Sequence, residues 1–356
     1  MKPYIILGIV QPGLEDLACQ ELEQLGITKY FKLKGGVEFV GHQSALIKCN
    51  LMCRIFSRFV IRLDSFIATT FRELDAKLNN LPWNYYIVNQ KVCFHINSVS
   101  SKLYHEKAIA MTLIAFLNKA CKHEIEIVGS PDEPDTQLVI VNVKNNQFTI
   151  SLDSSGIHLH KRGYMPWREK APLRETTASA MLRCIPDSDK PIIDPMCGAG
   201  TILIEKAVQA KKQPLSLFRD FTFQNWSLFQ EDTFKQVEAF FMEKVIENPR
   251  IVLKGSDIDE KSIKTCKFNA ESAGVSDIID FEVKDIADYL GTLKRHIIVT
   301  NPPYGVRVKG VHLIGKLTKL ASKNEVYFLH PLKHRTGDTL FTTNNGAITV
   351  HYQKIR

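Results

Sequence analysis

Apolar residues in the first part of the chain recur with two periods, one typical of strands and one typical of helices. Residues 4–10, YIILGIV, form a short apolar run that predicts a strand. From Leu14 to Gly26 the apolar residues lie three or four positions apart, which predicts a helix that ends at the glycine. The same patterns predict a strand at 35–41, a helix at 42–55 and a strand at 59–66. Residues 1–65 are therefore expected to form a small α+β unit.

A second α+β module is expected over residues 66–165. A short amphipathic helix over 71–87 is followed by a stretch, 91–120, that reads as a strand, a serine-rich basic loop and a long helix. Residues 137–156 then alternate between apolar and polar on both sides of Lys-Asn-Asn-Gln at 144–147. That pattern predicts a β-hairpin.

From residue 191 onward the pattern changes to strand, turn and helix. Three segments, at 191–210, 250–274 and 295–305, each begin with a short apolar run, as strands buried on both faces do. The alternation predicts an α/β domain over 166–356 with a mostly parallel sheet. Ligands of such sheets bind at the carboxyl ends of the strands.

Composition and charge narrow the class of protein. The chain of 356 residues is 44% hydrophobic and 24% charged, which is typical of a globular protein, and its net charge of +8 is compatible with a nucleic-acid partner. Its eight cysteines form no C-x-x-C pair, which favours a reducing compartment and gives no sign of a zinc site. The longest apolar stretch, 108–117, is too short to span a bilayer, and the first residues read as a strand and not as a signal peptide. A cytoplasmic protein without metal or membrane contact is expected.

A glycine-rich turn and two later carboxylates indicate a nucleoside-containing cofactor. Gly198 and Gly200 follow a strand and precede a helix, so their backbone can approach a ligand closely, with amide groups directed at it. The third glycine of a dinucleotide fingerprint is missing. Asp257 ends a strand about sixty residues on, where an acid can accept both ribose hydroxyls, and Asp285 could accept an adenine amino group.

The sequence Asn301-Pro302-Pro303-Tyr304 ends the third strand with an amide, two prolines and an aromatic ring. The amino group of a nucleobase is a poor nucleophile, because its lone pair is delocalised into the ring. Two acceptors, the Asn301 side-chain oxygen and the Pro302 carbonyl, could hold both of its N–H bonds, and the prolines fix that carbonyl at little entropic cost. The Tyr304 ring offers a stacking face for a base turned out of a helix.

In this order, these motifs resemble the S-adenosylmethionine-dependent methyltransferases that methylate amino groups. The resemblance implies a Rossmann-like fold with a mostly parallel seven-stranded sheet and S-adenosylmethionine as cofactor. It assigns Asn301 to Tyr304 to catalysis. It assigns the methionine, ribose and adenine parts of the cofactor to Asp194, Gly198, Gly200, Asp257, Ile258 and Asp285, with Arg174, Glu175 and Thr176 bordering the methionine end.

The amino-terminal half resembles the modules of RNA-modifying enzymes. Residues 97–110, the hairpin and 159–164 resemble a THUMP domain, and the first 65 residues resemble the ferredoxin-like unit that precedes it. The whole is similar to the THUMP-containing guanine-N2 methyltransferases of bacterial large-subunit rRNA and of tRNA. RNA is therefore the expected partner. The mixture of cations and aromatics suits phosphate contact and base stacking, and the residues concerned are Lys102, Tyr104, His105, Lys161, Arg162, Tyr164, Trp167 and Arg168.

Several alternatives stay open from the sequence. The catalytic motif also suits adenine-N6 methylation of a nucleic acid, and the same fold could serve a non-catalytic RNA-binding assembly factor. Val306 and Arg307 replace the residue types usual after this motif, which bears on the choice of target. Asn345-Gly346 predicts the turn of a carboxy-terminal hairpin.

Overall fold

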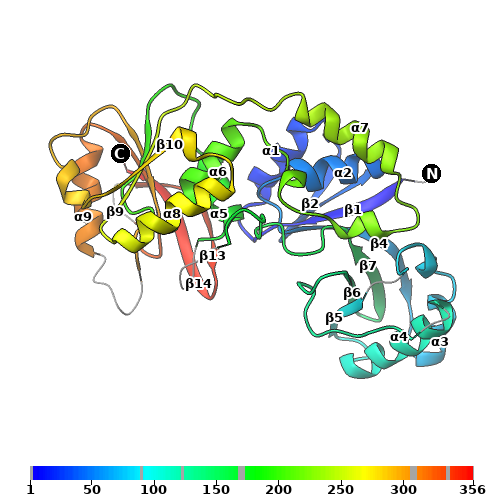
Figure 1. Cartoon of the computed structure of the whole chain (residues 1–356). Coiled ribbons are helices and arrows are strands. Elements are labelled where there is room, and N and C mark those ends of the chain that lie inside the picture. The colour runs from blue at the N-terminus through cyan, green and yellow to red at the C-terminus, as the bar shows by residue number, and fades with distance from the viewer. Residues whose placement is uncertain are drawn as a thin grey trace.

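The computed structural model describes residues 3–88, 91–121, 124–166, 173–304, 311–333 and 337–355. Within these residues the strands form two seven-stranded sheets. In Figure 1 the amino-terminal sheet lies on the right and the carboxy-terminal sheet on the left. The chain thus has an α+β half and an α/β half, as the hydrophobic patterns predict.

The first module contains one strand more than the sequence predicts. Its elements are β1 (Tyr4–Ile9), α1 (Glu15–Gln24), β2 (Tyr30–Leu33), β3 (Gly36–Gly41), α2 (Gln43–Met52) and β4 (Arg58–Ile67). The unexpected strand, β2, pairs with β3 at the edge of the sheet. Helices α1 and α2 bury their apolar faces against β3 and β4, which leaves the opposite face of this part of the sheet uncovered by helices of the module.

The second module continues the same sheet. Its elements are α3 (Phe71–Leu78), η1 (Trp83–Tyr85), β5 (Lys91–Val99), α4 (Glu106–Cys121), β6 (Thr136–Lys144) and β7 (Gln147–Asp153). The predicted hairpin is β6–β7, and Asn145 and Asn146 turn it with φ values of +51° and +66°, which asparagine tolerates. Strand β4 pairs with β1 and also with β7, giving the order β2-β3-β1-β4-β7-β6-β5. The boundary expected at residue 65 therefore falls inside a strand that both modules share.

The carboxy-terminal half holds the α/β sheet, in the order β10-β9-β8-β11-β12-β14-β13. The five strands β8 to β12 are parallel to one another. Strand β14 is antiparallel to both of its neighbours, β12 and β13, so β13 runs in the same direction as β12. The strands are β8 (Ile192–Asp194), β9 (Leu253–Asp257), β10 (Ile279–Val283), β11 (Ile297–Thr300), β12 (Glu325–His330), β13 (Gly337–Asn345) and β14 (Ile348–Ile355). The helices are α5 (Glu175–Arg183), α6 (Thr201–Ala210), η2 (Leu215–Leu217), η3 (Thr222–Asn225), α7 (Glu231–Met242), α8 (Glu260–Ser272), η4 (Ser276–Ile278), η5 (Ile286–Tyr289) and α9 (Val311–Ala321).

Both faces of this sheet are covered, which explains the unbroken apolar runs in its strands. On one face Ile192 and Ile297 belong to the same core cluster as the apolar residues of α6. On the other face Ile193 and Ile298 pack with α9 and η5. A strand buried on both faces needs an apolar residue at every position, so the sequence shows a continuous run and no alternation.

The insertion between α6 and β9 joins the two halves. Its helix α7 lies along α2 of the first module, as Figure 1 shows. The Gln43 side chain donates to the Leu228 carbonyl at 3.0 Å and accepts from the Gln230 N–H at 2.9 Å. Gln43 is 4% exposed, so these bonds form away from water and fix the position of the amino-terminal sheet relative to the α/β half.

In the described part of the chain, no helix has both the length and the apolar character needed to cross a bilayer.

Candidate active site

Three functional side chains stand where neighbouring strands of the α/β sheet end. Asp194 is the last residue of β8, Asp257 is the last residue of β9, and Asn301 directly follows β11. These strands are parallel and adjacent, with β8 in the middle. Their carboxyl ends meet at one edge of the sheet, so the three side chains come together although they are far apart in the sequence.

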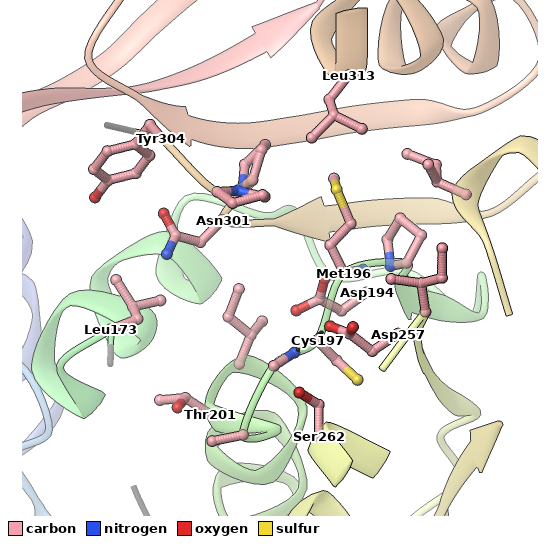
Figure 2. A pocket seen from close by; sticks show the side chains of 18 of the residues that line it. Leu173, Asp194, Met196, Cys197, Thr201, Asp257, Ser262, Asn301, Tyr304 and Leu313 are labelled. Carbon is pink, nitrogen blue, oxygen red and sulfur yellow. Dashed lines mark hydrogen bonds between the residues drawn. The ribbon is translucent and has the colours of Figure 1, made fainter. Parts of the chain in front are cut away.

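A single cavity of about 860 Å³ lies at this edge (Figure 2). In this view Asn301 lies between Tyr304 and the carboxylate of Asp194, and Asp257 lies on the far side of Asp194. The sequence-predicted residues that line the cavity are Asp194, Gly198, Asp257, Ile258, Asp285, Asn301, Pro302, Pro303 and Tyr304, with Arg174 beside them. The proline-containing loop and the glycine turn therefore share one cleft.

Three residues predicted to lie at the cofactor do not line this cavity in the part of the chain described. Glu175 and Thr176 are buried inside α5, each at 2% exposure, whereas Leu173 and Arg174 before them face the cavity. Gly200 has φ +84°, and a Cβ there would meet Ile204, Cys266 and Phe281 at 3.1–3.4 Å. Gly200 is required by its backbone angle and by the packing behind the turn, and not by approach of a ligand.

The N–H groups of the glycine turn are used within the protein. The Gly198 N–H donates to Asp257 Oδ2 at 3.0 Å, and the Gly200 N–H donates to the Cys197 carbonyl at 2.8 Å. The expectation that both amides point at a ligand is therefore wrong. The first of these bonds instead ties the turn after β8 to the carboxylate at the end of β9.

The carboxylates of Asp257 and Asp285 can still accept hydrogen bonds from a ligand in the cavity. The second oxygen of Asp257, Oδ1, accepts the Asp259 N–H at 3.0 Å, and each carboxylate oxygen has a further lone pair. Asp285 caps η5 by accepting the Ala287 N–H at 2.7 Å and also accepts from Lys316 Nζ at 3.1 Å. These two donors hold the pKa of Asp285 below its ordinary value, so it stays an acceptor at neutral pH.

Asp194 differs from the other two because it is almost fully buried. It is 2% exposed, and its Oδ1 accepts the Met196 N–H at 3.2 Å. Burial raises the pKa of the Asp194 carboxyl to about 7, because the anion loses hydration that the neighbouring Thr300 side chain and Met196 amide only partly replace. Near neutral pH the charge of this group therefore responds to what binds beside it.

Replacing Asp194 with asparagine is expected to stabilise the protein at pH 8 and to have much less effect at pH 4. In the folded wild type the carboxyl stays protonated until about pH 7, whereas in the unfolded chain it ionises near its ordinary pKa. The stability that the buried carboxyl contributes at low pH is thus lost as the pH rises between these values, by an amount on the order of a few kcal/mol. Asparagine cannot ionise and avoids this loss. Urea unfolding of both proteins at the two pH values measures the difference; an equal effect at both would contradict it.

Asn301 carries a buried oxygen without a partner. Its Oδ1 is inaccessible to solvent and accepts no hydrogen bond from the described residues. A buried amide oxygen in this state costs about 1–3 kcal/mol. Such a cost is typical of a group kept free for a ligand, and here the group lines the cavity.

Tyr304 is held by a residue that the sequence analysis did not assign to the site. Asn345, at the end of β13, donates from Nδ2 to Tyr304 Oη at 2.6 Å. Asn345, Gly346 and Ile348 of the carboxy-terminal hairpin also line the cavity. The turn of this hairpin is Gly346-Ala347, one position later than predicted, because Asn345 still pairs with Ile348. In the sequence, Asn345-Gly346 indicates a turn, but no residue near it indicates that Asn345 contacts Tyr304.

Several of the residues expected to contact RNA are exposed at the surface, and one of these is in an ion pair. Lys102 and Tyr104 are exposed, and the Tyr104 ring lies 4.0 Å from the ring of His105, centre to centre. Lys161 is also exposed, but its ammonium group pairs with Asp132 at 2.7 Å. Trp167, Arg168 and Arg307 lie outside the described residues.

Arg162 is a correction to the predicted RNA-binding set. Its side chain is fully buried and pairs with Glu205 of α6, with Nε 3.0 Å from Oε1 and Nη2 3.2 Å from Oε2. Tyr164 is buried with it and donates to the same carboxylate. A guanidinium in this position cannot reach a phosphate, so Arg162 holds the fold together and does not bind RNA.

Comparison with known proteins identifies the family. Residues 162–331 match the family model UPF0020, described as RMKL-like, methyltransferase domain, and residues 9–60 match the RlmL ferredoxin-like domain. The chain is 33% identical over 321 residues to "Putative RNA methyltransferase YpsC" of Bacillus subtilis, covering 86% of this chain and 81% of that protein. The chain belongs to the RMKL-like methyltransferase family.

Further relatives agree with membership of this family. The chain is 30% identical to the ribosomal RNA large subunit methyltransferase K/L of Vibrio parahaemolyticus, over 97% of this chain, and spans about half the length of that relative. The crystal structure of SMU.472 complexed with SAH superposes with a TM-score of 0.86, at 24% identity, over 100% of this chain and 98% of that one. The Rossmann-like methyltransferase fold and the ferredoxin-like unit expected from the sequence are thereby confirmed. The two family models leave residues 61–161 unmatched, so the THUMP assignment of that stretch stays a prediction.

Proposed function

We propose that this chain is an S-adenosylmethionine-dependent RNA methyltransferase that methylates the exocyclic N2 amino group of a guanosine in large-subunit rRNA. Its relatives are named as RNA methyltransferases and as large-subunit rRNA methyltransferases. The observation that carries the proposal is the buried Oδ1 of Asn301, which accepts no hydrogen bond within the described part of the chain and lies at the same cavity as Asp194 and Asp257. An acceptor held free beside carboxylates fits a reaction between a nucleobase amino group and a nucleoside cofactor.

The residues around the cavity suit S-adenosylmethionine. Asp257 has lone pairs for ribose hydroxyls, and Ile258, which is 71% exposed, offers an apolar side chain for an adenine ring. Asp194 and the turn after it would lie at the methionine end, where a carboxylate can pair with an ammonium group. When bound, this cofactor supplies a methyl group on a positively charged sulfur. Within the described residues no cluster of three or more metal-ligating side chains occurs.

The residues of the chain would act on the amino group by positioning it. The Asn301 Oδ1 and the Pro302 carbonyl accept hydrogen bonds from the two N–H bonds. These bonds increase the electron density on the nitrogen and favour a pyramidal nitrogen, whose lone pair is no longer delocalised into the ring. Burial of the Asn301 oxygen strengthens its bond to the amino group, because water does not compete. Tyr304 provides the ring on which the base stacks. The gain in rate comes from orientation and from a site in which the acceptors need no rearrangement.

Nucleoside analysis of methylated RNA tests this proposal. The purified protein is incubated with S-adenosylmethionine and either rRNA or tRNA from a strain that lacks the gene, and the RNA is digested to nucleosides for mass spectrometry. N2-methylguanosine formed on large-subunit rRNA supports the proposal. N2-methylguanosine formed on tRNA alone would show that the substrate is tRNA and not large-subunit rRNA. The absence of any methylated product would overturn the enzyme assignment in favour of an RNA-binding assembly factor.

Adenine-N6 methylation is the second candidate, because the acceptor pair at Asn301 and Pro302 fits any amino group on a purine ring. The same digest distinguishes it, since N6-methyladenosine without N2-methylguanosine would establish adenine as the target base. The remaining alternative, a non-catalytic RNA-binding assembly factor, predicts that calorimetry detects no binding of S-adenosylmethionine.

Charge reversal at Lys102 is expected to weaken RNA binding and to flatten its dependence on salt. Lys102 is exposed in the loop before α4, next to the exposed ring of Tyr104. Loss of one phosphate contact lowers the slope of log K against log salt by about 0.9. Binding of rRNA at several salt concentrations measures this for Lys102→Glu. The matched control is Lys235→Glu on α7, another exposed lysine, and equal slopes for both variants would contradict a role for the Lys102 loop.

A further inference from the structure

The carboxy-terminal hairpin contributes a polar side chain to the edge of the cavity where Tyr304 lies. Strand β14 is inserted between β12 and β13, and this places the turn after Asn345 next to the loop that follows β11. The bond from Asn345 Nδ2 to Tyr304 Oη spans 41 residues of sequence and measures 2.6 Å. The Tyr304 hydroxyl accepts this bond, and the Tyr304 ring makes an edge contact with the His330 ring at 5.8 Å between centres.

The hairpin is anchored on both sides, so Asn345 is a firm support. Strand β14 pairs with β13 from Ile348 to Ile355, and with β12 from His351 to Ile355. On the other side Thr343, which is 3% exposed, donates from Oγ1 to the Pro12 carbonyl of the first module at 2.9 Å. A side chain two residues from such an anchor has few ways to move, which is what a supporting residue requires.

We propose that Asn345 is a positioning residue for methyl transfer, which acts by fixing the Tyr304 ring against which the target base stacks. This inference rests on the proposed function. With its hydroxyl held by Asn345, the ring keeps one orientation before the base arrives, so no rotational freedom is lost when the stack forms. Without that bond the ring is oriented by apolar packing and by the His330 contact, which fix its tilt less firmly than a hydrogen bond does, and the base is aligned with Asn301 for a smaller fraction of the time.

A double-mutant cycle of Asn345→Ala and Tyr304→Phe tests the inference. Phenylalanine keeps the ring and removes the hydroxyl. Each single variant is expected to reduce kcat for methylation of rRNA about tenfold, roughly the contribution of one hydrogen bond. The double variant is expected to be no slower than either single one, because both changes remove the same bond. The affinity for S-adenosylmethionine and the Tm should stay at wild-type values. Asn345→Leu, similar in size to asparagine, should reproduce the loss seen with alanine.

The matched control is Thr349→Val on the same hairpin. Thr349 is exposed and donates to Asn344 Oδ1 at 3.1 Å, so this variant removes a hairpin hydrogen bond that does not reach the loop. Its kcat should equal that of the wild type. The inference is overturned if Asn345→Ala slows the Tyr304→Phe protein as much as it slows the wild type, or if neither Asn345 variant changes kcat. If the wild-type protein transfers no methyl group to RNA, the proposed function itself fails, and this outcome is distinct from either of those.

Discussion

Replacing Asn301 with alanine should reduce methyl transfer by about 10²- to 10³-fold while leaving the affinity for S-adenosylmethionine unchanged. That range is typical for removal of one preorganised polar group that acts on the reacting atoms. The cofactor side of the cavity is formed by other residues, chiefly Asp257 and the turn after β8, so its affinity should not change. Single-turnover kinetics on rRNA and calorimetry with the cofactor measure the two effects separately.

The same variant should be as stable as the wild type or slightly more stable. In the wild type the Asn301 oxygen is buried and has no hydrogen-bond partner among the described residues, and alanine removes that unfavourable group. A loss of activity combined with an unchanged or higher Tm is the behaviour expected of a residue kept for function at some cost to stability. A residue needed only for folding would show the opposite combination.

Asn301→Asp serves as the matched control, because it keeps an oxygen acceptor of the same size at the same position. It should retain more activity than the alanine variant, although its negative charge is unfavourable in a buried site. Wild-type turnover by Asn301→Ala, or loss of cofactor affinity equal to its loss of turnover, would show that Asn301 does not act on the target amino group.

The sequence could predict the site because its residues follow strands with strong local patterns. Strands β8 and β11 each read as an apolar run that ends in a polar residue, and an apolar run at 251–253 leads into β9, which ends at Asp257. Parallel strands bring their carboxyl ends to one edge, so the convergence of Asp194, Asp257 and Asn301 follows from fold class alone.

What the sequence could not predict depends on contacts between distant segments. Strand β2 was missed because it is an edge strand with little burial, and its Phe31 is 75% exposed. The pairing of β4 with β7, which merges two modules into one sheet, leaves no mark on the local pattern of either strand. The bond between Asn345 and Tyr304 depends on the insertion of β14 between two other strands, an order that hydrophobic periodicity does not encode.

Arg162 shows how a local pattern can mislead. It lies in the basic segment His-Lys-Arg-Gly-Tyr at 160–164, which is typical of a nucleic-acid surface. Its partner Glu205 lies 43 residues away. A signal was nevertheless present, because Glu205 stands between Ile204 and Lys206 in a helix whose other residues are mostly apolar and buried. A carboxylate in such a helix requires a buried cation or several donors, and Arg162 is that cation.

Replacing Arg162 with alanine should destabilise the protein by about 3–5 kcal/mol, the range for removing one partner of a buried ion pair. The Arg162 guanidinium also donates to the Leu159 carbonyl at 2.8 Å and to the Arg54 carbonyl at 2.6 Å. It thus connects the first module, the segment before α5 and helix α6. Urea unfolding measures the loss, and Lys161→Ala, which removes a surface charge next to it, should cost no more than about 1 kcal/mol.

The pH dependence of this loss distinguishes a buried ion pair from simple loss of packing. Burial alone would raise the pKa of Glu205, but Arg162 and Arg54 hold it below its ordinary value. The ion pair therefore stabilises the fold fully when the pH is above the ordinary pKa of a glutamate, and less as the pH falls through the lowered pKa. In Arg162→Ala the carboxylate has lost its main cation and can be protonated, so the destabilisation should shrink between pH 8 and pH 4.5. Glu205→Ala leaves Arg162 buried instead, and a guanidinium cannot be neutralised in this range. Its destabilisation should therefore persist at both pH values, and an equal pH response of the two variants would mean that charge is not what Arg162 supplies.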